Sequence, residues 1–392
     1  MHAAKDHADV PGAAVPAPPA HRLFAHMPRA DQRRWASVYL KGLLTTQGKK
    51  SLRRLAASVT PSPTAPQSLQ QFVNDSAWRW RPVRAELARW IAEHTTAHAW
   101  TLSPVVIPKR GELSAGVHRR FVPALGRTVN CQLAIGAFLS GEHGDLSVDW
   151  QLYLPRRWTE DDRLRLRARI PDTAGHDSAA GLCLALADRL AQTTPGTLPV
   201  VVHTDGHIDA RTVIEGLDAR GLAWIVAVPD ALPLSLARAA DPHRAAGGAV
   251  PHPAPEPART LLRRHTGPHS TAASAPGCPR PGTLPVLLPS PVDPRPALLV
   301  GARTTATARP GRIWLTNLPP ARHAQALDLI CSADAARIGA AETEMGLHDF
   351  AGRSYPGWHR HATLVSVASA HRRLGHDLCP AGGGRSRTPG HD

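Results

Sequence analysis

Four side chains that can bind a metal ion or transfer a proton alternate along one short stretch of the sequence. They are His203, Asp205, His207 and Asp209, and the apolar run 198–202 comes directly before them. In open α/β sheets, functional groups gather where strands end and helices begin. Imidazole and carboxylate groups bind Zn²⁺ or Mn²⁺, which activate water for hydrolysis. The stretch is therefore a candidate metal site, although Asp209 is equally well explained as the N-cap of a following helix.

The elements around this stretch predict how its side chains are positioned. Alternating or continuous apolar runs predict five strands, at residues 102–107, 130–139, 148–154, 198–203 and 222–228. The first three favour an antiparallel meander, and helical patterns separate the last two. This order predicts an α/β fold of ribonuclease-H-like type, a mixed sheet flanked by helices and preceded by an N-terminal helical region.

Composition and periodicity divide the chain into six segments. They are a disordered lead (1–20), a helical region (21–98), the first part of the ribonuclease-H-like domain (99–230), a proline-rich insertion or linker (231–311), the second part of that domain (312–374) and a disordered tail (375–392). The insertion is expected to be largely irregular, with short strands at 284–288 and 297–300. One long helix is expected from about Ala321 to Met345.

The charge balance favours a polyanionic partner. The 392 residues include 46 Lys+Arg and 31 Asp+Glu, a formal net charge of +15. Such an excess favours DNA or RNA binding, or reflects a basic, arginine-preferring proteome. The five cysteines are scattered, which argues against a zinc knuckle or a disulfide framework and suits a reducing cytosol. No apolar run is long enough to span a membrane, so we expect a soluble, cytoplasmic protein without a membrane partner.

Basic residues concentrate around a predicted turn between two N-terminal helices. Two short helices joined by a tight basic turn indicate a helix-turn-helix, or else a plain helical bundle with solvated basic faces. The candidate phosphate contacts are Lys49, Lys50, Arg53, Arg54, Lys109 and Arg110. Contacts of this kind would position a duplex without reading its sequence.

Three separated stretches resemble one protein family. They are SLQQFVNDSAWRWRPVR at 68–84, VDWQLYLPRRW at 148–158, and GLHDFAGRS at 346–354 followed by GWHRH at 357–361. The sequence resembles bacterial insertion-sequence transposases of the DDE type, most closely the insertion sequence 701 group. The resemblance implies a ribonuclease-H-like catalytic domain in which three carboxylates hold two divalent ions, Mg²⁺ or Mn²⁺, for phosphodiester displacement. It also implies binding to double-stranded DNA at the element ends, a nucleoid location and a homo-oligomer, with no small-molecule cofactor.

The sequence departs from the family pattern at all three acidic positions. Aligned on Pro108-Lys109, the first position falls on Ser103 and Pro104, and the second falls on Thr204, one residue before Asp205. The third falls on Ala335, while the adjacent Asp334 lies about 100° away around a helix. The Trp-Arg pair and the Lys that usually accompany this acid fall on Ser332, Ala333 and Glu342.

We therefore expect a transposase-family DNA-binding protein with lost or weakened strand transfer. Asp205 is the one catalytic candidate, and Mg²⁺ or Mn²⁺ is expected only if catalysis is retained. One alternative is a metal-dependent hydrolase that uses His203, Asp205 and His207. Another is a non-catalytic regulator that pairs with an active transposase and blocks it. Stoichiometric zinc that is lost on His203→Ala would favour the hydrolase, and salt-sensitive duplex binding would favour the DNA-binding protein.

Overall fold

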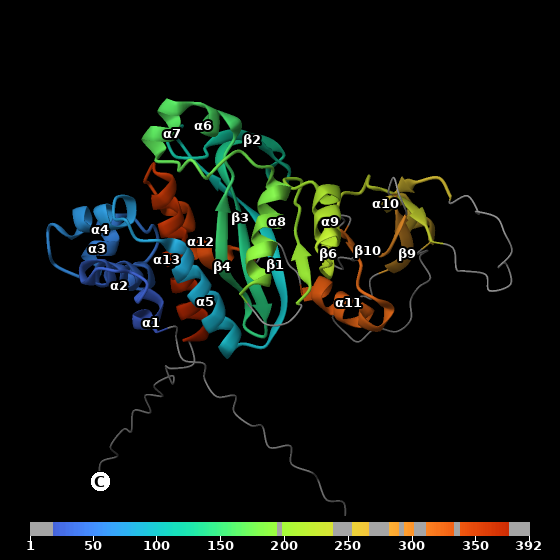
Figure 1. The fold of residues 1–392 in the computed structure, drawn as a ribbon, viewed down its shortest axis with the longest axis horizontal. Coiled ribbons are helices and arrows are strands. Elements are labelled where there is room, and N and C mark those ends of the chain that lie inside the picture. Colours follow the sequence, from blue (N-terminus) through green and yellow to red (C-terminus); the bar gives the residue numbers. More distant parts are fainter. Residues whose placement is uncertain are drawn as a thin grey trace, which may run out of the picture.

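One large sheet lies at the centre of the molecule in a computed structural model of the chain (Figure 1). The structure describes residues 19–193, 198–237, 253–265, 282–289, 294–301, 311–332 and 338–375. Most of the predicted lead and tail lie outside these residues. No helix in the described ranges is long and apolar enough to cross a bilayer.

The described strands form one mixed sheet. They are β1 (Ala97–Pro108), β2 (His118–Val122), β3 (Arg127–Gly141), β4 (Gly144–Leu152), β5 (Val200–Val202), β6 (Trp224–Val228), β7 (Pro233–Leu236), β8 (Glu256–Pro257), β9 (Gly282–Leu288), β10 (Arg295–Gly301) and β11 (Ile313–Thr316). The order across the sheet is β2-β3-β1-β5-β6-β11-β10-β9-β7-β8, with β4 also paired to β3. Strands β1, β3 and β4 are the predicted antiparallel meander, and β5 and β6 run parallel to β1.

Helices cover both faces of this sheet, as expected for the fold class. They are α1 (Ala20–Phe24), α2 (Ala30–Thr45), α3 (Leu52–Ala57), α4 (Ala65–Asn74), α5 (Trp80–His94), α6 (Arg156–Glu160), α7 (Asp162–Ala168), α8 (Ala179–Ala191), α9 (Ala210–Ala219), α10 (Ala258–His265), α11 (His323–Ser332), α12 (Ala340–Glu344) and α13 (Tyr355–Leu374). Helices α1–α5 fall in the predicted N-terminal helical region, and α1–α4 lie at one side of the molecule (Figure 1).

The alternation of side chains along the strands creates two apolar layers. Val200 and Val202 of β5 face the larger core, which includes residues of α5, α8, α9 and α13. Val201 lies on the opposite face and packs with Trp314 of β11 and Ile330 of α11. Because successive side chains of a strand point to opposite faces, a three-valine strand serves both layers. The end of β5 is thereby fixed in the centre of the sheet.

One sequence expectation differs from the observed elements. The described parts of the region 231–311 contribute β7, β8, β9 and β10 to the sheet and carry α10. Strands β9 and β10 confirm the two short strands that were expected there. The predicted helix 321–345 was wrong as a single helix, because α11 ends at Ser332 and Gly339 adopts a left-handed φ of 78° before α12. A left-handed residue cannot continue an α-helix.

Candidate functional site

The predicted site stretch begins where β5 ends, beside the centre of β1. The parallel register pairs Leu102 with Val202, and the His203 backbone N–H donates to the Leu102 carbonyl over 2.9 Å. The next residues in this register are Ser103 and His203, so the first and second expected acidic positions, Ser103 and Thr204, lie one residue out of register on neighbouring strands. This is the strand edge at which an open α/β sheet presents its functional groups.

Neither of these two positions carries a carboxylate. Ser103 is buried within β1 and pairs with Gly136 of β3, and the following residue is Pro104. The Thr204 hydroxyl is also buried and donates to the carbonyl of Ala227, on the neighbouring strand β6, over 2.9 Å. Thr204 thus holds two strands together at the place where the second acid was expected.

Asp205 leaves the strand in a left-handed conformation and meets a cation. Its φ is 47°, and Gly206 follows with a φ of 71°. The carboxylate of Asp205 forms an ion pair with Nη2 of Arg312, which comes just before β11. The Nη1 of the same guanidinium donates to Nδ1 of His203 over 2.7 Å. One arginine therefore ties together the two residues that flank Thr204.

Burial dominates the protonation behaviour of this pair of residues. Burial raises the pKa of Asp205, and the Arg312 guanidinium opposes that shift. Burial, with a smaller contribution from Arg312, lowers the pKa of His203 to about 3. Because an arginine only donates hydrogen bonds, Nδ1 of His203 is the acceptor and the proton of the neutral ring is on Nε2. His203 is therefore a neutral ring held edge-on to Trp314, with 5.0 Å between ring centroids.

The structure does not bring the four metal-binding candidates together. His207 lies on the side of His118 and Arg120, and burial lowers its pKa to about 4. Asp209 caps α9, where its Oδ1 accepts the backbone N–H of Thr212 over 2.8 Å. Among the described residues, no group of three His, Cys, Asp or Glu side chains is placed to hold a metal ion.

The third expected acidic position, Ala335, and the adjacent Asp334 lie outside the described residues. Glu342, at the position of the family's lysine, is buried on α12 and accepts a hydrogen bond from the Ser369 hydroxyl over 2.9 Å. Burial raises the pKa of Glu342, and the described residues around it form no metal-binding group. In the described part of the site, a single carboxylate that is already paired with a guanidinium does not fit two divalent ions.

The amino-acid sequence also matches the sequence model of a known protein family. The sequence model of the DDE superfamily endonucleases matches residues 22–283, which is most of the chain. The chain belongs to the DDE superfamily endonucleases. The match begins in α1 and ends in β9, so it includes the N-terminal helices, the meander and the end of β5.

The similarity of this chain to a solved transposase structure is weaker. A cryo-EM structure of the piggyBac transposase synaptic complex with hairpin DNA matches with a TM-score of 0.39 and 9% sequence identity. The alignment covers 87% of this chain and 65% of that one, so this chain spans less than two thirds of the transposase. No curated protein matches the sequence.

The six basic candidates of this DDE superfamily member differ in their exposure. Lys49, Arg53, Arg54 and Arg110 are exposed, whereas the other two are held within the fold. The backbone N–H of Lys50 donates to the Asp349 carboxylate over 2.7 Å, and its ammonium donates to the Thr46 carbonyl.

Lys109 is held in a similar way by the same late segment. Its Nζ donates to the Phe350 carbonyl over 2.9 Å, and burial lowers its pKa to about 8. The stretch 346–354 is the most distinctive part of the family resemblance. It holds Lys50 and Lys109 within the fold, although both are candidates for DNA phosphate contacts in the sequence.

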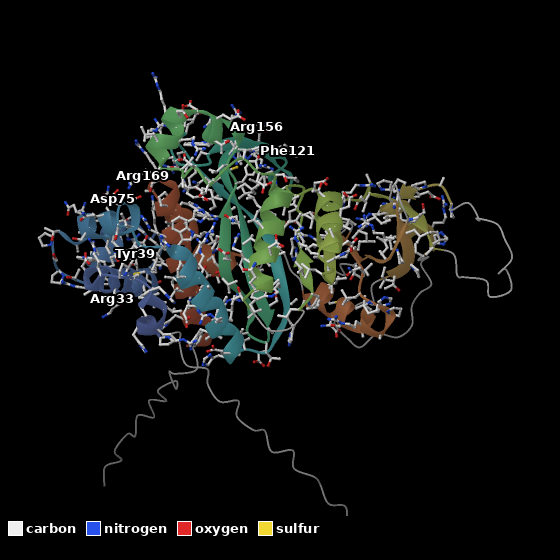
Figure 2. All side chains as sticks on the ribbon, in the orientation of Figure 1. Arg33, Tyr39, Asp75, Phe121, Arg156 and Arg169 are labelled. Atoms are coloured by element: carbon white, nitrogen blue, oxygen red, sulfur yellow. The ribbon has the colours of Figure 1, made fainter. Side chains whose placement is uncertain are left out.

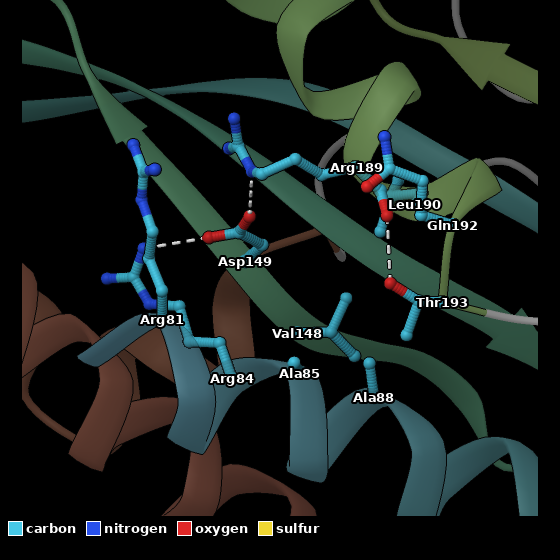
Figure 3. Close-up of a pocket in the computed structure, with 10 residues that line it drawn as sticks. All are labelled: Arg81, Arg84, Ala85, Ala88, Val148, Asp149, Arg189, Leu190, Gln192 and Thr193. Atoms are coloured by element: carbon cyan, nitrogen blue, oxygen red, sulfur yellow. Dashed lines mark hydrogen bonds and ion pairs between the residues drawn. The ribbon is translucent and has the colours of Figure 1, made fainter. Parts of the chain in front are cut away.

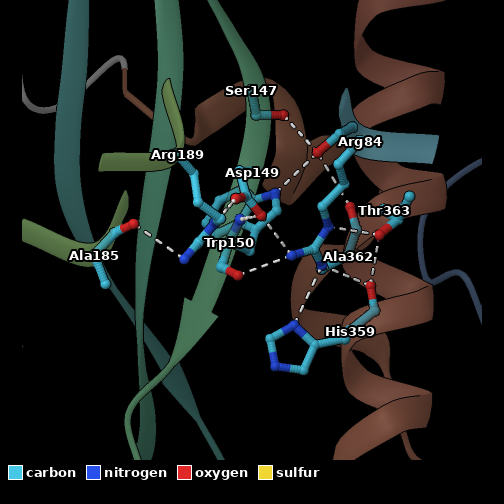
Figure 4. Close-up of polar contacts among 10 residues, drawn as sticks. Arg84, Ser147, Asp149, Trp150, Ala185, Arg189, His359, Ala362 and Thr363 are labelled. Carbon is cyan, nitrogen blue, oxygen red and sulfur yellow. Dashed lines mark hydrogen bonds and ion pairs between the residues drawn. The ribbon is translucent and has the colours of Figure 1, made fainter. Parts of the chain in front are cut away.

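Sequence reasoning missed a largely buried ionic network that joins α5, β4 and α8. Arg84 of α5 donates to Asp149 of β4 over 2.8 Å, and Nε of Arg189 donates to the other oxygen of Asp149, also over 2.8 Å (Figure 4). The remaining donors of Arg84 reach the Trp150 and His359 carbonyls and the Thr363 hydroxyl. Figure 3 shows Asp149 between the two guanidinium groups, beside a cavity of about 270 Å³.

This network gives a structural role to two of the stretches that carry the family resemblance. Arg84 ends the stretch 68–84, and Asp149 lies in the stretch 148–158. Their ion pair joins α5 to β4, and Arg84 also joins both to α13 through Thr363. The signal in the sequence is the family resemblance itself, because nothing in local composition predicts which arginine is buried.

Proposed function

We propose that this protein binds double-stranded DNA as a transposase-type member of its superfamily and has lost or weakened the metal-dependent strand transfer. The proposal rests above all on Arg312. Its guanidinium pairs with Asp205, the carboxylate that follows the expected second acidic position by one residue. A positive charge beside this carboxylate competes with any divalent cation that would bind to it.

Electrostatics explains why this arrangement opposes metal binding. Two divalent ions are held close together only when several carboxylates neutralise their charge and supply hard oxygen ligands. Here Ser103 and Thr204 supply no charge, and the single negative charge of Asp205 is already neutralised by Arg312. A metal ion would have to displace the guanidinium and then remain beside it.

Duplex binding is supported by charge rather than by a formed site. The chain carries a formal net charge of +15, and Lys49, Arg53 and Arg54 are exposed around the start of α3. Phosphate contacts by such residues supply much of the affinity of proteins for DNA. We further propose that the DNA is the ends of an insertion sequence of the 701 group, in a bacterial cytoplasm and nucleoid, and that the protein acts as a homo-oligomer.

One experiment tests both parts of this proposal. Purified full-length protein is mixed with duplexes taken from the two flanks of its own gene, with Mg²⁺ or Mn²⁺, over a range of KCl concentrations. We expect binding that weakens steeply with salt and no strand cleavage with either ion. Efficient cleavage would refute the loss of catalysis, and a failure to bind at low salt would refute the DNA-binding function.

Charge variants show whether binding uses the proposed surface. Arg53→Glu, at the start of α3, should weaken binding several-fold. Arg263→Glu is a matched control, because Arg263 is also exposed and lies on α10, far from α3 in Figure 1. Equal effects of the two variants would mean that only the net charge of the protein matters.

A further inference from the structure

The hairpin formed by β2 and β3 presents two exposed apolar side chains. Phe121 is 57% exposed and Leu125 is 52% exposed, in a chain with few large apolar residues on its described surface. Phe121 lies on β2 opposite Thr128, and Leu125 ends the short 3₁₀ turn Pro123–Leu125. Figure 2 shows Phe121 at the outer edge of the molecule, near α6.

The base of this hairpin is held firmly by polar contacts. The Val117 carbonyl accepts hydrogen bonds from the Trp158 indole over 2.9 Å and from the Arg157 guanidinium over 3.0 Å. Arg120 stacks over the Tyr153 ring at 5.2 Å and donates to His118 over 3.0 Å. Exposed apolar side chains on a preorganised arm lose little conformational entropy when they bind.

The charge around the two apolar side chains favours a polyanion. Arg119 and Arg127 are exposed, and neither forms an ion pair with any residue in the described ranges. No acidic residue occurs between Leu113 and Gly141. The tip of the hairpin therefore combines apolar surface with uncompensated positive charge.

The hairpin also lies against the end of β5. Gly206 packs so closely on the hairpin that an added Cβ would be 2.8 Å from Cγ of Pro123. His207 lies near Arg120 and His118, the residues that anchor the hairpin. A duplex that reaches the candidate functional site would therefore meet this arm.

We propose that Phe121, together with Leu125, inserts as an apolar wedge between adjacent base pairs of bound duplex DNA. Arg119 and Arg127 contact the phosphates on either side of the opened step. Apolar wedges of this kind unstack a base step and bend the duplex, and the cost is repaid by the additional contacts that the bend allows. The inference rests on the proposed DNA-binding function, and it adds a specific distortion that phosphate contacts alone do not produce.

The test measures unstacking separately from binding. The probe is a blunt-ended duplex with 2-aminopurine at several positions, whose fluorescence rises when the base is unstacked, and fluorescence anisotropy reports binding in parallel. At saturating protein and low salt, we expect the wild-type protein to raise the 2-aminopurine signal several-fold. Phe121→Ser should abolish most of this rise while anisotropy still reports a complex, and Phe121→Leu should retain part of it.

A matched control variant shows whether the fluorescence rise depends on this particular apolar pair. Leu166→Ala removes an even more exposed apolar side chain, on α7, and should leave the fluorescence rise unchanged. Binding without a rise, or an equal rise with Phe121→Ser, would overturn the wedge and leave the DNA-binding proposal standing. Absence of any complex would overturn both. If Phe121→Ser changed only the oligomeric state, seen by sedimentation, the apolar pair would be a protein–protein contact and the wedge would be overturned.

Discussion

At the scale of single residues, Asp149 shows how charge is stabilised inside this fold. Burial alone would raise its pKa, but the guanidinium groups of Arg84 and Arg189 outweigh that effect and lower it. Arg84 is almost fully buried, so most of its charge is compensated by Asp149 rather than by water. Removing one partner of a buried pair costs far more than the net stability that the pair provides, because a charge is left uncompensated.

Asp149→Asn should therefore lower the free energy of unfolding by about 3 kcal/mol. The matched control is Asp75→Asn, because the side chains of Asp75 and of its ion-pair partner Arg169 are each about half exposed. The control should cost less than about 1 kcal/mol. Urea denaturation of the three proteins at pH 7 measures both values. Equal losses in the two variants would contradict the proposed difference between buried and exposed pairs.

The candidate site could be predicted only in part at this scale. The sequence alone indicates that the strand ending at Val202 leads into the site and that Ser103 and Thr204 replace acids there. It also identifies Asp209 as a helix cap, as observed. The pairing of Asp205 with Arg312 could not be foreseen, because the two residues are far apart in the chain and meet only through the β5-β6-β11 arrangement.

At the scale of elements, α13 organises the whole domain. This helix is buried along most of its length and contacts α2, α4, α5, α12 and β4. His361 lies in its first half, where Nδ1 is 2.8 Å from the Tyr39 hydroxyl and Nε2 is 2.9 Å from the Gly346 carbonyl. Since a carbonyl only accepts, Nε2 carries the proton and Nδ1 accepts from Tyr39. One neutral ring thus links α2, α13 and the segment 346–354.

Acid should destabilise the protein through this histidine. Burial lowers the pKa of His361 to about 4, below the ordinary value of 6.5. Between these two values the unfolded chain binds one more proton than the folded chain, so stability falls as the pH drops from 6.5 towards 4. The contribution is on the order of 3 kcal/mol over that window. In urea denaturation at several pH values, His361→Gln should show a shallower decline than the wild type.

An exposed histidine provides the control for this pH dependence. His98 is exposed on β1, so His98→Gln should decline with falling pH as the wild type does. If His361→Gln kept the full wild-type slope, the ring would already be equally protonated in the folded and unfolded states. The other buried histidines contribute to the absolute slope, and therefore only the difference between variants is informative.

Strands with a clear alternation or run of apolar residues could be predicted from the sequence. The remaining strands depend on pairing with segments that are distant in the sequence. The alternating pattern of 148–154 predicts β4, and the apolar run before His203 predicts β5. In the proline-rich region, β10 pairs with β11, β9 pairs with β10, and β7 pairs with β9. Local composition does not reveal these contacts. The predicted long helix failed at Gly339 because sequence periodicity continues past a left-handed turn.

At the scale of the whole molecule, two basic surfaces are candidates for the same duplex. One comprises the exposed residues Lys49 and Arg53 at the start of α3, and the other comprises Arg119 and Arg127 of the β2–β3 hairpin. Figure 1 shows α3 and β2 on different parts of the molecule. A single duplex that contacts both must extend from the N-terminal helices to the hairpin, whereas two separate sites would bind independently.

The salt dependence of binding distinguishes these arrangements. Each phosphate contact contributes about 0.9 to the slope of log K against log salt. The double variant Lys49→Gln/Arg53→Gln should therefore reduce the slope by about 2, and Arg119→Gln/Arg127→Gln should do the same. If one duplex spans both surfaces, the quadruple variant should reduce it by about 4, because the effects of distant sites add. Arg263→Gln, on α10, should leave the slope unchanged, and a quadruple variant no different from either double would show that the surfaces do not share one duplex.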